Sequence, residues 1–486
     1  MKVKDVLFFV LAVISILGII MLIFPSDGIR ISKDFTLYFP DFKEMFPVRS
    51  EPKIDIDSLL KSQINIEDIE SDTDSNNVIY FEKLKKKITS LEFPENNPEA
   101  LQRFFNKLSG LGKEDRIRIM HYGDSQIEGD RITADLRHKF QSKFGGTGIG
   151  LVMPVSIYAQ SSISQSKSEN WRRYAGFGAI DSTLNHDRYG PMIAFNRFAP
   201  VNDSAASKEK TKYSAWLEFE KSYLSYPNTA LFKNVIIFYG NSSEKVQIAL
   251  SSNGEILMTD TLNTGEDFFV FKYSSDKYLD NIKIEFEGYD SPDFYAISLE
   301  DDYGIYIDNI GLRGSSGDVF SNHDTRLLQS SYFELKPDLF ILQFGGNIVP
   351  YTTNENMAKQ FANYFRYHLY FLKNIVPEAD FIVIGPSDMS TKEKDSYVTY
   401  PYLENIIDEL RKASHDVGAV YWDTYKAMGG KNSMPVWVNT DPPLASSDYV
   451  HFTPQGSVII SNMFYNALMF DYQLHLKNKN RNNEKE

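Results

Sequence analysis

The sequence predicts an α/β protein built on a doubly wound parallel sheet, with an inserted antiparallel β domain and an N-terminal transmembrane helix. Three observations support this. Short apolar runs that end in polar, glycine-rich loops alternate with helical periodicity in the last third of the chain. Apolar and polar residues alternate strictly in the middle of the chain, and an uncharged apolar run lies near its start.

The apolar run, Val6 to Phe24, follows Lys2 and Lys4 and ends at Pro25. As a helix it would be roughly 28 Å long, close to the ~30 Å of bilayer hydrocarbon. The lysines favour a cytoplasmic N-terminus, so residues 1–29 are predicted to be an uncleaved signal anchor with the rest of the chain outside the membrane. A cleaved signal peptide is the alternative.

Residues 30–97 mix small apolar clusters with acidic segments such as Glu67 to Asn77, which is typical of a spacer. Asn97 and Pro98 form a helix-start signature, and we expect the catalytic fold to begin there. The charged end of the chain, residues 477–486, is predicted to be a disordered tail.

The first part of the α/β domain, residues 98–164, contains a turn that exposes a serine. Ile117 and Ile119 indicate a buried strand, Gly123 breaks it, and apolar residues then recur at helical spacing. Ser125 is therefore predicted on a strand-to-helix turn, where open α/β sheets bind ligands and where helix N–H groups are free. Asp124 is interpreted as a helix cap.

Residues 165–303 are predicted to form an inserted antiparallel β sandwich or jelly roll. Val246, Ile248 and Leu250 illustrate its alternation, and turn signals separate the short runs. A βαβ unit needs only about 30 residues. The far longer stretch between Ser125 and the next βα loop therefore indicates an insertion between the first two strands.

The α/β pattern resumes over residues 304–476. The predicted strands are Ile305–Leu312, Leu339–Phe344, Phe381–Ile384 and Ala419–Trp422, and the predicted helices are Glu355–Ile375 and Leu403–Ser414. Thr453 and Pro454 are expected to start a last helix.

Composition excludes several classes of function. The net charge is −14 and no basic helix is found, so nucleic acid is not an expected partner. The chain has no cysteine, which excludes disulfides and thiolate metal sites, and its eight histidines show no ligand spacing. No metal and no cofactor are predicted. Lysines and arginines are scattered, so no steering of anionic substrates is expected.

A carboxylate and a histidine lie close together near the end of the chain. Asp448 precedes His451 by three residues in the loop before the last helix. Such a carboxylate can accept a hydrogen bond from one ring nitrogen, which leaves the other nitrogen to take a proton from a serine.

With these residues in view, the chain resembles the SGNH (GDSL-type) esterases, whose fold is flavodoxin-like. The family's four blocks occur in order, as Gly123-Asp124-Ser125, Gly314 within Gly-Leu-Arg-Gly-Ser-Ser, Gly345-Gly346-Asn347, and Asp448-Tyr449-Val450-His451. The resemblance implies Ser125 as nucleophile, His451 as general base and Asp448 as its partner. It also implies an oxyanion hole made by the N–H groups of Ser125 and Gly314 and the side chain of Asn347.

Two positions in these blocks need comment. Gly311 and Gly317 are alternatives to Gly314, which is chosen because the predicted strand ends near Leu312. Gln126 replaces the leucine of the family's name motif, a departure that bears on the substrate rather than on the chemistry.

An SGNH domain interrupted by a β sandwich is similar to the peptidoglycan O-acetylesterases, which carry a carbohydrate-binding-like insert. The resemblance implies an esterase that removes O-acetyl groups from a cell-envelope glycan, peptidoglycan or polysaccharide, in the periplasm and anchored in the inner membrane. One alternative is a glycan O-acetyltransferase that works with a membrane-bound O-acyltransferase. A non-catalytic glycan-binding protein is the other. Trp171, Trp216, Tyr223 and Tyr226 are candidate sugar-stacking residues, although core packing is the commoner role.

Overall fold

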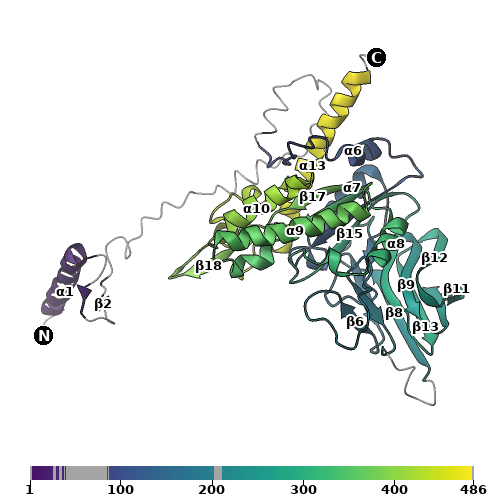
Figure 1. Cartoon of the computed structure of the whole chain (residues 1–486). Helices are drawn as coiled ribbons and strands as arrows, with labels where there is room; N and C mark the ends of the chain where they lie inside the picture. Colours follow the sequence, from purple (N-terminus) through teal and green to yellow (C-terminus); the bar gives the residue numbers. More distant parts are fainter. Residues whose placement is uncertain are drawn as a thin grey trace. The chain divides into compact units, whose positions relative to one another are not determined.

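The computed structural model describes residues 3–25, 29–31, 36, 37, 39, 85, 87–201 and 211–483. The chain divides into one unit of residues 1–55 and another of residues 56–486. The first unit contains helix α1 (Val3–Ile23) and a small antiparallel pair, β1 (Ile29–Arg30) and β2 (Thr36–Leu37) (Figure 1).

Helix α1 covers most of the predicted membrane segment and begins three residues earlier, so that its first turn includes the charged residues Lys4 and Asp5. Of the helices in the described part of the chain, none is long and apolar enough to cross a membrane. The prediction of a transmembrane helix in residues 1–29 is therefore not supported. The acidic segment Glu67 to Asn77 lies outside the described residues.

A parallel sheet with the strand order β15-β3-β16-β17-β20 forms the centre of the second unit. Numbered along the chain, this order is 2-1-3-4-5, which is the order of flavodoxin-like sheets and agrees with the doubly wound parallel sheet that was predicted. Its strands are β3 (Arg116–Gly123), β15 (Gly304–Gly311), β16 (Leu339–Gln343), β17 (Asp380–Ile384) and β20 (Val420–Trp422). Apolar side chains from all of them are buried, as expected for a sheet covered on both faces.

Helices cover this sheet in two packed groups. Helix α9 packs on α10 in front of the sheet in Figure 1, and α13 packs on α7 and α6. Because crossover connections are right-handed, the strand order places the two groups on opposite faces. The helices are α6 (Gln102–Ser109), α7 (Thr133–Phe144), α8 (Thr325–Leu335), α9 (Glu355–Ile375), α10 (Leu403–Asp416), α11 (Thr424–Ala427), α12 (Ser433–Val438) and α13 (Pro454–Asn483), with 3₁₀ turns η1 (Glu128–Asp130), η3 (Phe320–Asn322) and η4 (Gly346–Tyr351).

The segment between β3 and β15 contains antiparallel sheets that share one apolar core. One sheet has the order β11-β10-β13-β8-β5, with bounds Glu255–Leu262, Val246–Ser252, Asn281–Gly288, Tyr213–Lys221 and Ile163–Lys167. The other has the order β12-β9-β14-β7-β6, with bounds Gly265–Leu279, Phe232–Ser242, Asp293–Glu300, Ala194–Arg197 and Arg172–Ala175. Strand β4 (Gly150–Val152), which lies before the predicted start of the insert, also pairs with β14. Jelly-roll connectivity and the domain boundaries stay predictions.

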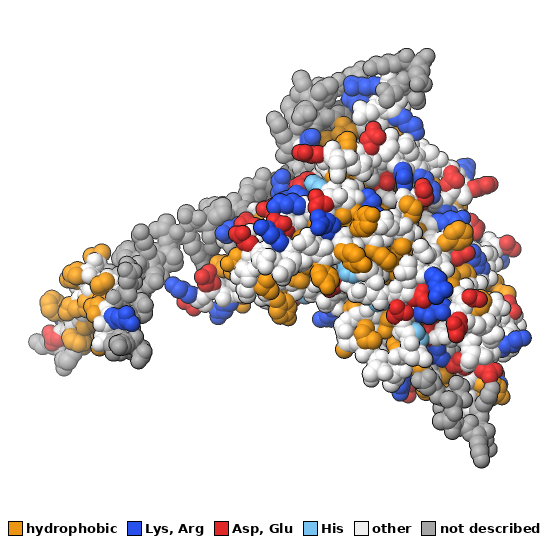
Figure 2. Space-filling model, in the orientation of Figure 1, with side chains coloured by type: hydrophobic (Ala, Val, Ile, Leu, Met, Phe, Trp, Pro, Cys, Tyr) orange, Lys and Arg blue, Asp and Glu red, His pale blue; other side chains and the backbone are white. Residues whose placement is uncertain are grey.

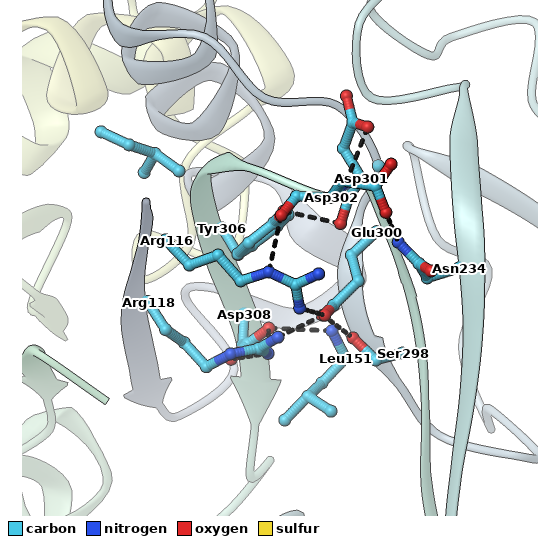
Figure 3. A network of polar contacts seen from close by, with 12 residues as sticks. Arg116, Arg118, Leu151, Asn234, Ser298, Glu300, Asp301, Asp302, Tyr306 and Asp308 are labelled. Carbon is cyan, nitrogen blue, oxygen red and sulfur yellow. Dashed lines mark hydrogen bonds and ion pairs between the residues drawn. The ribbon is translucent and has the colours of Figure 1, made fainter. Parts of the chain in front are cut away.

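A buried ion network joins the parallel sheet to the β insert (Figure 3). Arg118 on β3 donates two 2.9 Å bonds to Asp308 on β15 and also pairs with Glu300 on β14. Asp308 accepts a 2.8 Å bond from the backbone N–H of Leu151 on β4. A Cβ at position 150 would lie 2.4 Å from Asp308 Oδ1, which explains Gly150. The network therefore fixes the insert against the edge of the sheet that carries β15.

The ends of the α/β part differ from the prediction. Helix α6 starts at Gln102 rather than at Asn97, whose amide instead donates to the carbonyl of Gly418. Glu92 pairs with Tyr421 on β20, so the last part of the predicted spacer packs against the sheet. Helix α13 continues to Asn483, and the prediction of a disordered tail is wrong for residues 477–483.

Candidate active site

The serine turn lies at the carboxyl end of β3, as predicted. Gly123 ends the strand between Gly311 of β15 and Gln343 of β16. A Cβ on Gly123 would lie 3.0 Å from the carbonyl oxygen of Gln343, so any side chain there would push the neighbouring strand away. The regular helix does not follow at once, however. Turns and η1 occupy the interval, and α7 begins only at Thr133, so the N-terminus of that helix does not start at Ser125.

Ser125, His451 and Asp448 form one hydrogen-bonded chain. Ser125 Oγ lies 2.8 Å from His451 Nε2, and His451 Nδ1 lies 2.7 Å from Asp448 Oδ2. Since a carboxylate only accepts, Nδ1 carries the proton and Nε2 is left to accept the serine proton. Residues 326 positions apart in sequence therefore meet in the geometry of a nucleophile and its general base.

Asp448 is held in place by its own loop. Its Oδ1 accepts 3.0 Å bonds from the backbone N–H groups of Val450 and His451. Burial alone would raise the pKa of Asp448, but the hydrogen bonds from the His451 side chain and from the two N–H groups lower it below its ordinary value. Asp448 is consequently an anion at neutral pH and orients the imidazole.

A stacked tyrosine pair supports the catalytic loop from outside. Tyr449 adopts a left-handed backbone conformation with φ of 58°, which costs a non-glycine residue free energy. Tyr397, on the β18–β19 hairpin (Ser390–Glu393 and Ser396–Thr399), stacks on it with ring centroids 3.5 Å apart. The backbone N–H of Ser390 donates to the carbonyl of Tyr449. Nothing in the sequence pattern indicated this role for the hairpin.

Gln126, the departure from the family motif, also holds this loop. Its Nε2 donates a 2.7 Å bond to the carbonyl of Val450, the residue before His451. The Gln126 side chain is 9% exposed. The residue after the nucleophile thus ties the serine turn to the histidine loop, a role that sequence reasoning missed because the two lie 324 residues apart.

Replacing Gln126 by leucine should therefore loosen His451. Gln126→Leu preserves side-chain size but leaves the carbonyl of Val450 without its donor, a loss of about 1–3 kcal/mol. We expect the second-order rate constant for labelling of Ser125 by a fluorophosphonate to fall about tenfold. Gln247→Leu, at an exposed position on β10 of the insert, is the control. An unchanged labelling rate in Gln126→Leu would show that this bond does not position His451.

Asp124 joins the serine turn to the third block. Its Oδ1 accepts a 2.9 Å bond from the backbone N–H of Gln126, and it also accepts from the backbone N–H of Gly346. Burial raises the pKa of Asp124 to about 6, although these bonds and the nearby His451 oppose the rise. Asp124 therefore does more than cap a helix, because it fixes the turn at Ser125 and ties it to Gly346 of the third block.

Because its pKa is raised, ionisation of Asp124 should lower the free energy of unfolding as the pH increases. The folded pKa lies about two units above the unfolded value near 3.9, so its contribution to stability is complete below about pH 4 and is lost as the pH rises through 6. Asp124→Asn cannot ionise. The difference in free energy of unfolding, variant minus wild type, should increase by about 2–3 kcal/mol between pH 4 and pH 7. Urea unfolding at several pH values measures it, and a difference independent of pH would contradict the burial argument.

Two backbone N–H groups near Ser125 are free to donate. In the described residues, neither the N–H of Ser125 nor that of Gly314 has an acceptor within the protein. The N–H of Gly317, by contrast, donates to Ser315 Oγ, and Gly311 belongs to the β15–β3 ladder. Gly314 has a φ of 87° and open space around its Cα. Of the three glycines, Gly314 is therefore the one suited to an oxyanion hole.

Asn347 lies in η4, at the end of β16. Gly345 precedes it with a φ of 110°, and Asn347 Nδ2 donates a 2.8 Å bond to the carbonyl of Ser315. Ser315 follows Gly314, so one amide proton of Asn347 ties the two blocks together while the other remains for a ligand. The third predicted donor thus belongs to the same loop cluster.

A cavity of about 270 Å³ opens beside the Gly314 loop, at the boundary with the β insert. Gly311, Arg313 and Gly314 line one wall, and Glu128 and Gly129, which follow the serine turn, line another. A wider groove shares Glu128, Gly129 and Tyr158 with it and extends to Tyr223 and Leu224 on the insert.

The predicted sugar-stacking residues have different surroundings. Trp171 is buried in the core of the insert, and its Nε1 donates to the carbonyl of Trp216. Tyr226 stacks on His138 and donates to Asp135. Trp216 is half-buried, with Lys283 over its ring at 5.7 Å, and does not line the groove. Tyr223 is 93% exposed and is the one of the four that lines the groove.

The fold resembles that of a known esterase. A structure described as "Peptidoglycan O-acetylesterase in action, 5 min" matches with a TM-score of 0.59 and 19% identity over 76% of this chain and 96% of that chain. Axe2, an acetylxylan esterase from Geobacillus stearothermophilus, matches with 19% identity over 35% of this chain and 75% of the Axe2 chain. Its TM-score is 0.25, so this match supports no conclusion about the fold. No family model and no curated protein matches. The chain therefore shares its fold with that peptidoglycan O-acetylesterase, which agrees with the likeness predicted from the sequence.

Proposed function

We propose that this chain is an SGNH-type serine ester hydrolase that removes O-acetyl groups from a cell-envelope glycan. The observation that carries the proposal is the hydrogen-bonded chain from Ser125 through His451 to Asp448 at the carboxyl edge of the parallel sheet. The likeness of the fold to a peptidoglycan O-acetylesterase supports an acetylated glycan as substrate.

In the first half-reaction, Ser125 Oγ attacks the acetyl carbonyl carbon while its proton passes to His451 Nε2. Asp448 stabilises the imidazolium that forms. The carbonyl oxygen becomes an oxyanion, and the N–H groups of Ser125 and Gly314 and the Asn347 amide are the proposed donors to it. The intermediate then collapses, His451 gives its proton to the sugar oxygen, and the sugar hydroxyl leaves.

In the second half-reaction, water attacks the acetyl-serine. His451 takes a proton from the water and later returns it to Ser125 Oγ, so that acetate leaves and the free enzyme is restored. If a glycan hydroxyl replaced water in this step, the same residues would catalyse O-acetyl transfer.

The decisive experiment incubates the purified full-length protein with O-acetylated peptidoglycan and with a chito-oligosaccharide acceptor in one tube. The hydrolase proposal requires release of acetate that depends on Ser125. Acetylated oligosaccharide with little free acetate would instead identify a transferase. If neither product formed and fluorophosphonate failed to label the protein, the protein would be a binding protein.

An extracytoplasmic location accompanies this proposal. It is supported by the apolar run Val6 to Phe24 after two lysines, the pattern of an export sequence. Fractionation of cells that produce the tagged full-length protein tests it, and recovery in the cytosol would contradict it.

A further inference from the structure

The cavity beside the Gly314 loop contains a cation without a carboxylate partner. Arg173 on β6 lines it and is partly buried. Within the described residues, the Arg173 guanidinium has neither an ion pair nor a hydrogen bond; it lies over the face of Phe177, 5.8 Å from the ring centroid, and interacts electrostatically with the Tyr158 side chain. Burial lowers the pKa of Arg173, yet an arginine remains charged at any physiological pH. A partly buried, unpaired charge is costly, and a bound anion would compensate it.

The other charged groups at the cavity leave Arg173 available. Arg313 and Glu128 also line it, but they face each other at 3.5 Å, and Arg313 lies against the Tyr158 ring at 5.1 Å. Their charges offset one another. Glu128 also lies 3.8 Å from Arg131, so the charge that faces a ligand is positive, and Arg173 is, among the described residues, the cavity-lining cation without a carboxylate partner.

The rest of the lining suits a sugar ring. Leu151, Met153, Met192 and Ile310 provide an apolar floor, with Tyr158 beside them. Sugars combine apolar C–H faces with polar edges, whereas a free inorganic anion would gain nothing from this floor. The volume of about 270 Å³ lies just below the ~300–1,000 Å³ of drug-sized pockets, so about one ring fits.

The cavity also lies where a neighbouring sugar would be. Its walls include Gly314, the proposed oxyanion donor, and Glu128, three residues after the nucleophile. The groove that leads from it past Tyr158 to Tyr223 offers a path for the continuing polymer.

We propose that this cavity is a subsite for a sugar unit that bears a carboxylate, with the carboxylate bound by Arg173. The inference rests on the proposed function and narrows its substrate to acidic O-acetylated glycans. The carboxylate comes either from a uronic acid or from the lactyl group of a muramic acid unit that carries no stem peptide.

Direct contact with Arg173, and not long-range electrostatic attraction, would bind the acidic sugar. The chain carries a net charge of −14, and Figure 2 shows acidic and basic side chains interspersed over the displayed face. Such a surface does not attract a polyanion from a distance. Arg173 must therefore contribute by direct contact, where a hydrogen-bonded charge pair changes affinity by roughly 10–100-fold.

The test compares Arg173→Gln with Arg172→Gln in the full-length protein. Arg172 is the preceding residue of β6, is exposed and does not line the cavity, so it controls for the change in net charge. The substrates are O-acetylated oligomannuronate, the same oligosaccharide after reduction of its carboxylates to alcohols, O-acetylated N-acetylglucosaminyl-N-acetylmuramic acid, and 4-nitrophenyl acetate.

We expect wild type and Arg172→Gln to prefer one of the acidic substrates over the reduced oligosaccharide at least tenfold in kcat/KM. Arg173→Gln should lose this preference through a higher KM and hydrolyse 4-nitrophenyl acetate as wild type does. The acidic substrate that is preferred identifies the source of the carboxylate. If Arg173→Gln lost kcat/KM equally on the acidic and the reduced substrates, or if wild type showed no preference for an acidic substrate, the inference would be overturned.

A binding measurement separates this inference from the proposed function. Calorimetric titration of non-acetylated oligomannuronate and of the muramic acid disaccharide requires no catalysis. Binding of either that is lost in Arg173→Gln supports the subsite even if no acetyl ester is hydrolysed. The subsite is rejected if neither ligand binds. It is also rejected if the oligomannuronate and its reduced counterpart bind equally and the disaccharide does not bind.

Discussion

Ser125→Ala should lower kcat for hydrolysis of an acetyl ester by about 10⁴–10⁶-fold, because it removes the nucleophile that lies 2.8 Å from His451 Nε2. The remaining oxyanion donors would still stabilise attack by water, so a small residual rate over the uncatalysed reaction is expected. Acetate release measures the loss. Labelling by a fluorophosphonate should vanish at the same time, since Ser125 Oγ is the atom that would be modified.

Ser387→Ala is the matched control for this variant. Ser387 is a nearby buried serine whose hydroxyl lies 3.4 Å from Gln126 Nε2, and it does not contact His451. Its replacement should change kcat by only a few fold. If Ser125→Ala retained most of its activity while it unfolded at the wild-type temperature, Ser125 would not be the nucleophile.

Asp448→Asn should lower kcat by about 10³–10⁴-fold. Oδ1 of Asp448 accepts two backbone N–H groups, so an asparagine oxygen would keep that position and its amide NH₂ would face His451 Nδ1. The NH₂ group donates, which forces the proton onto Nε2 and prevents that nitrogen from accepting the serine proton.

Asp448→Ala provides an informative comparison. Alanine removes the carboxylate but does not impose the wrong tautomer, so this variant should retain more activity than Asp448→Asn. Steady-state kinetics on 4-nitrophenyl acetate measures both. A lower rate for Asp448→Ala than for Asp448→Asn would mean that the loop geometry, and not the tautomer of His451, limits the reaction.

Local pattern was sufficient for much of the fold. The predicted strands at 339–344 and 381–384 and the helix at 355–375 appear within a residue of their observed bounds. Continuous apolar runs and 3.6-residue periodicity report burial directly. The interval after Ser125 was predicted less well, because Ile132, Leu136 and Phe140 fit a helix while nothing marked the turns that delay α7 to Thr133.

The sequence by itself determined the order of the strands and helices and the pairing of Asp448 with His451, because periodicity and a three-residue spacing are local properties. Tertiary structure alone decided which glycine keeps a free N–H, that Gln126 supports the histidine loop, and that Arg173 faces a cavity beside Gly314. These features depend on the burial and hydrogen-bond partners of residues far apart in the chain, most of them in loops. Loops have no periodicity from which such partners can be derived, so only packing brings them together.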